Sequence, residues 1–308
     1  MAEENLREFI REIFSKDYEV TKESITSLTK PGDNFLSIML KVEVILKKRD
    51  DGSEKKLNAV AKCVKNSNEF VKRLFPTAFK NEIRFYKEIV PTLQNFQQER
   101  GIEDILDMFP EFYGARINNN GSDEVDDTAV ILLEDLKFDG YINVDRHEGF
   151  QLTRSKNYLK RYMQTTCHRL GLKNLLRLTY LRKKIRKKLY CFFLWSSVHL
   201  NVLKQNFDEL LIYYHTEFTD QLRRLNCNTN LFDIDKFWEE LDAVAPSNFM
   251  DIMYMTMFVV FGKKDRGDEL ETDEIVGVVK EDVPKAARDK IAFMVSEYGR
   301  RKWIEKSE

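Results

Sequence analysis

The chain has 308 residues, of which 43% are hydrophobic and 12% aromatic, so it can form one large or two modest folded domains and is not a disordered protein. Its 50 lysines and arginines nearly balance its 51 aspartates and glutamates, and the net charge of −1 gives the whole molecule no field that would attract nucleic acid. Residues 1–10 are acidic and lack the apolar core of a secretory signal, and no apolar run approaches the roughly 20 residues of a membrane span. We therefore expect a cytoplasmic protein without a transmembrane segment. Its four widely spaced cysteines are expected to be reduced thiols and not a disulfide or zinc framework.

Residues 1–136 alternate between helical and strand patterns. Apolar residues at helical spacing predict a first helix near residues 6–14, and alternating apolar and polar residues over 38–46 predict a half-buried strand or two joined strands. A turn at 49–53 returns the chain into a strand at 57–64, and a helix over 68–90 is expected to end at Pro91. Two further strands are expected at 109–115 and 128–133. This order predicts an α+β lobe built on an antiparallel sheet.

One charged residue, Lys62, interrupts the apolar strand 57–64, on the same side as Val60 and Val64. A buried ammonium is costly unless it is paired, so this strand predicts a carboxylate partner. Glu82, which has aromatic neighbours in the following helix, is the candidate. A strand lysine paired with a helix glutamate is the arrangement that kinases use to hold nucleotide phosphates. The alternative is a lysine on an edge strand whose ammonium reaches water.

The pattern in the second half of the chain predicts three helices. They are expected at residues 206–225, at 234–241 with Asp233 as the N-cap, and at 285–306. Between the two halves, residues 149–207 contain no aspartate or glutamate, and six of the nine residues 181–189 are lysine or arginine. A block of one charge sign is typical of a surface for anionic lipid or nucleic acid, or of a localisation signal. The plainer interpretation is a stretch that was not selected for function, for instance through misassembled coding sequence.

Several short motifs occur in a fixed order along the chain. They are PGDNFLS at 31–37, the strand ending at Lys62, FKNEIRFYK at 79–87, ILLEDL at 131–136, LWSSVHL at 194–200 and NFDEL at 206–210. Together they resemble the ecdysteroid kinase-like family, insect- and nematode-rich relatives of the choline kinases and aminoglycoside phosphotransferases.

The resemblance implies a protein-kinase-like two-lobe fold, with an antiparallel-sheet, nucleotide-binding lobe at residues 1–136 and a helical lobe at 137–308. The helical lobe is expected to be incomplete, because residues 150–192 form an atypical basic segment. The resemblance also implies weak binding of ATP and of a small hydroxylated molecule, such as an ecdysteroid or a xenobiotic, by a monomer. Lys62 would contact the phosphates and pair with Glu82. The remaining nucleotide-binding residues would be a phosphate-side loop of Gly32, Asp33 and Asn34 and the adenine-binding backbone of Glu134, Asp135 and Leu136.

The chain departs from the family where the chemistry is expected. Family members carry a His-Gly-Asp catalytic loop and then an asparagine and an Asp-Phe-type motif that hold magnesium. None of the four histidines here precedes Gly-Asp, and the acid-free interval occupies the place of both motifs. We therefore expect a catalytically inactive or truncated kinase-like protein without bound magnesium. Two alternatives are an active kinase that recruits Asp208, Glu209 or Asp220, and a binding protein whose basic segment contacts anionic membrane or nucleic acid.

Overall fold

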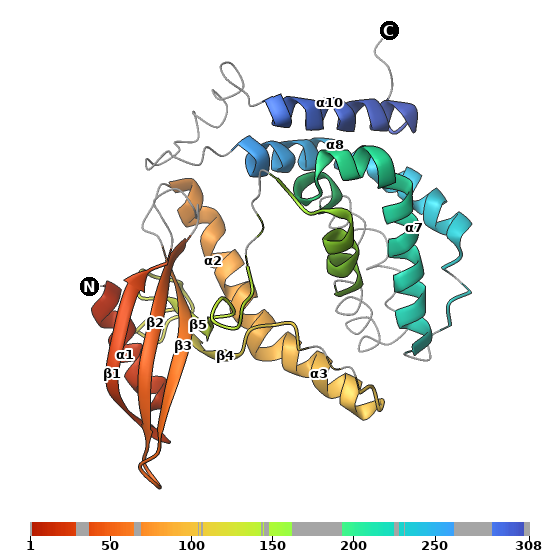
Figure 1. Ribbon diagram of the computed structural model, residues 1–308. Coiled ribbons are helices and arrows are strands. Elements are labelled where there is room, and N and C mark those ends of the chain that lie inside the picture. Colours follow the sequence, from red (N-terminus) through yellow and green to blue (C-terminus); the bar gives the residue numbers. More distant parts are fainter. Residues whose placement is uncertain are drawn as a thin grey trace. The chain divides into compact units, whose positions relative to one another are not determined.

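The computed structural model describes residues 2–28, 37–64, 69–103, 105, 107–142, 144, 148–161, 193–224, 228–230, 232–261 and 285–304 (Figure 1). The chain divides into two compact units. The described residues up to Thr92 and those of Asp107–Ile142 belong to a unit that contains a β-sheet. Residues Leu93–Leu106 and the described residues from position 144 onward belong to a helical unit. The lobe boundary at residue 136 stays a prediction.

The sheet has five strands in the order β1-β2-β3-β5-β4, and all neighbouring strands are antiparallel. The strands are β1 (Tyr18–Ser27), β2 (Ser37–Lys48), β3 (Glu54–Val64), β4 (Phe112–Arg116) and β5 (Val130–Glu134). The predicted α+β class and kinase-like fold are confirmed. Strand β1 was not expected from the sequence, because it is an edge strand without a fully buried residue and its register shifts between Val20 and Lys22.

The two faces of the sheet have different roles. Alternate residues of β3 (Leu57, Ala59, Ala61 and Cys63) are buried in a core shared with helix α1 (Ala2–Phe14). The intervening residues, Lys62 among them, lie on the other face and are only partly buried. Helix α2 (Glu69–Arg84) packs on that second face through Phe79, which contacts the buried β5 residue Ile131. The predicted side of Lys62 is therefore confirmed.

The expectation that the helix ends at Pro91 is wrong. A π-helical turn, η1 (Phe85–Ile89), follows α2, and the chain continues as α3 (Val90–Glu99). The amide of Val90 donates to the carbonyl of Phe85, five residues earlier. Such a wider turn lets the chain continue through Pro91, which has no N–H to donate.

The helical unit contains α7 (Leu200–Arg224), α8 (Ile234–Phe261) and α10 (Lys285–Arg300). The predicted helices are found. The predicted start of the first, Asn206, coincides with a kink in α7 (φ −133°, ψ 19°), and α8 extends further than expected, through Pro246. The Asp233 carboxylate caps α8 by accepting the amide of Lys236 at 2.8 Å. Among the helices that are described, none has the length and apolar character to cross a membrane. The basic residues 181–189 lie outside the described residues.

Candidate functional site

Lys62 and Glu82 form the predicted ion pair, in which Lys62 Nζ donates to Glu82 Oε2. Lys62 lies between Met39 of β2 and Ile131 of β5, so its strand is the centre of the sheet and not an edge. The two side chains are 24% and 29% exposed. An ammonium has three protons to donate. Because Lys62 is partly exposed and uses one of them for Glu82, it can also donate to an anion that approaches from solvent.

Aromatic contacts hold Glu82 in position. Phe79 is 1% exposed and packs three residues before Glu82 on the same helix. Three residues after Glu82, the Phe85 ring contacts the Phe109 ring edge-on, with 5.2 Å between the ring centroids. The Tyr86 ring stacks on Phe112 at 6.3 Å. These contacts fix α2 and η1 against the sheet, and they keep the carboxylate within reach of Lys62.

The segment Glu134–Leu136 leaves β5 as an ordered turn. The Glu134 amide donates to the carbonyl of Glu111 at 2.9 Å, and the Asp135 amide donates to the carbonyl of Asn58 at 3.1 Å. The buried Asp135 carboxylate accepts the amide of Lys137 at 3.1 Å, so this side chain builds the turn. Asp135 therefore holds the turn in two ways, with its amide bonded to β3 and its carboxylate bonded to the amide of Lys137.

Two backbone groups of this segment are placed to recognise a ligand. In an antiparallel strand the N–H and C=O of one residue point to the same edge, so the Glu134 carbonyl turns away from β3, as its amide does. The N–H of Leu136 has no acceptor among the residues that the structure describes. An adjacent acceptor and donor of this kind match the amino group and ring nitrogen at one edge of adenine.

Other predicted residues lie outside this arrangement. Gly32, Asp33 and Asn34 fall outside the described residues, so their role as a phosphate-side loop stays a prediction. The three carboxylates of the active-kinase alternative are engaged within the helical unit. Their partners are Arg301 for Asp208, Lys156 for Glu209 and Arg223 for Asp220.

The described residues around Lys62 do not form a metal site. Within the described ranges no three histidine, cysteine or acidic side chains gather in a way that could hold a metal. The Glu82 carboxylate is already neutralised by Lys62, whose ammonium would repel a divalent cation. These residues do not fit a magnesium site, and the predicted roles of Lys62 at the phosphates and of the 134–136 backbone at the base of ATP stay predictions.

Cys63 lies beside Lys62 in sequence but points into the core on the opposite face. Burial raises the pKa of its thiol to about 11, so at pH 8 it is almost entirely protonated and unreactive. We expect iodoacetamide at pH 8 to leave Cys63 unmodified in the folded protein and to modify it in urea, as measured by peptide mass spectrometry. Rapid native labelling that ATP suppresses would contradict this placement.

Comparison with known proteins gives one family. Residues 31–167 match the model of the ecdysteroid kinase-like family. No curated protein and no solved structure matches significantly. The matched stretch includes Lys62, Glu82 and the 134–136 segment, so the resemblance is confirmed for the motifs within residues 31–136, while those at 194–200 and 206–210 lie outside the match. Residues 31–167, somewhat less than half of the chain, are thus similar to the kinase-like proteins of the ecdysteroid kinase-like family.

Proposed function

We propose that this protein binds ATP on the open face of its sheet and does not transfer the terminal phosphoryl group. The observation that carries the proposal is the ion pair between Lys62 and Glu82, formed in a chain that has no His-Gly-Asp sequence. A small hydroxylated molecule is the second ligand that we propose, by analogy with the family, for a cytoplasmic monomer.

The geometry supports the first part of this proposal, ATP binding, which we call its nucleotide half. Asn58, which holds the Asp135 amide, lies four residues before Lys62 on the same strand face. At about 3.4 Å per residue the two positions are roughly 14 Å apart. An extended nucleoside triphosphate can span this separation, with its base at 134–136 and its phosphates at Lys62.

The absence of catalytic carboxylates supports the second part of the proposal, the lack of phosphoryl transfer, which we call its inactive half. Phosphoryl transfer depends on positioning and on neutralising charge, and in kinases carboxylates orient the acceptor hydroxyl and bind the metal ions. Residues 149–207, where the family carries these groups, contain no aspartate or glutamate. Asp208, Glu209 and Asp220, the substitutes considered from the sequence, are engaged with cations of the helical unit. A lysine without these carboxylates can hold a nucleotide but supplies neither base nor metal ligands.

The test compares ATP binding and ATP consumption in the wild-type protein and in Lys62→Met. We expect the variant to bind ATP about tenfold to a hundredfold more weakly by calorimetry, because it loses a charge-assisted hydrogen bond to phosphate. Both proteins should show the same background ATP consumption with magnesium and an ecdysteroid. Equal affinities would refute the nucleotide half, and turnover that Lys62→Met abolishes would refute the inactive half.

Folding must be checked separately. The two side chains are only 24% and 29% exposed, and the substitution leaves the Glu82 carboxylate without its partner, so the free energy of unfolding should fall by about 1–2 kcal/mol. Lys56→Met is the matched control, since Lys56 lies on the same strand and its side chain is 55% exposed beside Glu43. That variant should bind ATP as the wild type does.

A further inference from the structure

The carboxamide of Asn58 is incompletely satisfied. Its Oδ1 atom is buried and has no hydrogen-bond partner among the described residues. Buried polar atoms without a partner are rare in folded proteins, and each calls for an explanation such as a ligand or a strained functional site. Asn58 has no part in the Lys62–Glu82 pair, so the function proposed above does not yet account for it.

The surroundings of Asn58 place it at the base end of the proposed nucleotide site. It shares the partly open face of β3 with Val60 and Lys62. Its backbone carbonyl accepts the amide of Asp135, next to the two backbone groups that match adenine. A base lying along residues 134–136 would therefore be a neighbour of this carboxamide.

The residue opposite Asn58 on β2 does not supply the missing proton. Glu43, the register partner of Asn58 on β2, is an ionised carboxylate whose pKa is lowered by a hydrogen bond from Lys41 and by the charges of Lys41 and Lys56. It lies 2.9 Å from the Lys41 ammonium and 3.6 Å from that of Lys56. An ionised carboxylate only accepts hydrogen bonds, so it cannot donate to Asn58 Oδ1.

A carboxamide pairs with adenine in a defined way. Its oxygen accepts from the 6-amino group and its nitrogen donates to N7, whereas guanine presents two acceptors at the same edge. The torsion that orients the carboxamide is soft, so the oxygen can turn toward the open face when a base arrives. We propose that Asn58 is a specificity-determining residue that makes this site prefer adenine to guanine nucleotides. This inference rests on the proposed function.

The experiment measures the affinities of the wild type and of Asn58→Leu for ATP, GTP and inorganic tripolyphosphate. Leucine has a similar size and shape but neither a donor nor an acceptor. We expect the wild type to prefer ATP to GTP by about tenfold or more. Asn58→Leu should lose most of this preference and bind tripolyphosphate as the wild type does. Its melting temperature should not fall, because the substitution removes an unsatisfied acceptor.

The outcomes separate this inference from the proposed function. If Asn58→Leu keeps the wild-type ratio of ATP to GTP affinity while Lys62→Met still loses ATP binding, Asn58 does not read the base and the nucleotide site stands. A uniform loss of all three ligands in Asn58→Leu also overturns the inference, because it indicates damage to the whole site. If the wild-type protein binds neither nucleotide, the proposed function and this inference both fail.

Discussion

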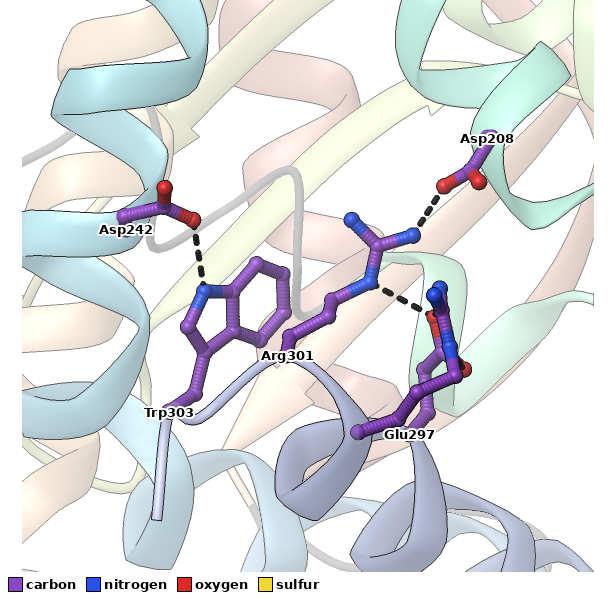
Figure 2. A network of polar contacts seen from close by, with 6 residues as sticks. Asp208, Asp242, Glu297, Arg301 and Trp303 are labelled. Atoms are coloured by element: carbon purple, nitrogen blue, oxygen red, sulfur yellow. Dashed lines mark hydrogen bonds and ion pairs between the residues drawn. The ribbon is translucent and has the colours of Figure 1, made fainter.

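Replacing Arg301 with methionine should lower the free energy of unfolding of the helical unit by about 2–4 kcal/mol. The Arg301 side chain is only 11% exposed, and its guanidinium donates to Glu297 Oε1 at 2.6 Å and to Asp208 (Figure 2). The guanidinium also lies 5.0–5.7 Å from the centroids of three aromatic rings, those of Phe207, Trp238 and Trp303. The substitution removes all these contacts together.

Glu297 accounts for most of the expected loss. Its side chain is 8% exposed, and burial by itself would raise the pKa of its carboxyl. Hydrogen bonds from Arg300 and Arg301 outweigh burial and hold that pKa below its usual value, so the group is charged in the folded protein. Without Arg301 it becomes a buried carboxylate with one exposed partner. Figure 2 shows that the same network reaches Asp242 through the indole N–H of Trp303, at 2.8 Å. Arg301 is thus central to a polar network that joins α7, α8 and α10.

Arg300→Met is the matched control. Arg300 also donates to Glu297, at 2.6 Å, but its side chain is 60% exposed, so its removal should cost less than about 1 kcal/mol. Urea unfolding followed by tryptophan fluorescence makes the comparison, because all three tryptophans of the chain lie in the helical unit. Equal losses in the two variants would mean that burial does not set the strength of these pairs.

The parts of this molecule that the sequence predicts are those with a local signal. Alternation located β2 and β3, and one lysine in an apolar strand was enough to predict Glu82 as its partner, because a buried charge requires compensation nearby. The pattern over residues 206–225 likewise predicted a helix, which is found within α7. Residues 31–36 and most of the basic segment fall outside the described residues, so the predictions made for them stay untested.

The features that were missed depend on contacts between distant residues. Arg301 lies in a run of charged residues that suggests a solvated helix end, and Asp208 is 93 positions away. Asn58 lies on the same side of β3 as Lys62, but its own sequence gives no sign of a role, and only the register with β2 and β5 shows its surroundings. Strand β1 exists because β2 offers it an edge to pair with, which its own sequence does not reveal. In each case the partner, and not the residue type, decides the role.

Replacing the buried Lys290 is expected to raise the free energy of unfolding, whereas most substitutions at buried positions lower it. Lys290 is 6% exposed within α10, and its ammonium donates to one backbone carbonyl, that of Ser196, at 3.3 Å. Burial lowers the pKa of this lysine from 10.5 to about 8. At pH 7 the folded protein therefore holds a charged group that burial disfavours, at a cost of the order of 3 kcal/mol. Lys290→Met, which keeps a similar length, should accordingly stabilise the helical unit by about 1–3 kcal/mol at pH 7.

The pH dependence tests the cause of this effect. Between pH 8 and 10.5 the unfolded chain keeps the Lys290 proton while the folded protein releases it, so the stability contributed by this group rises with pH. The advantage of Lys290→Met in urea unfolding should therefore shrink across that interval and be nearly absent at its upper end. Lys285→Met, at an exposed position of the same helix, should stay within about 0.5 kcal/mol of the wild type throughout. A Lys290→Met protein that is less stable than the wild type at pH 7, by an amount that does not change with pH, would mean that the ammonium is satisfied where it lies.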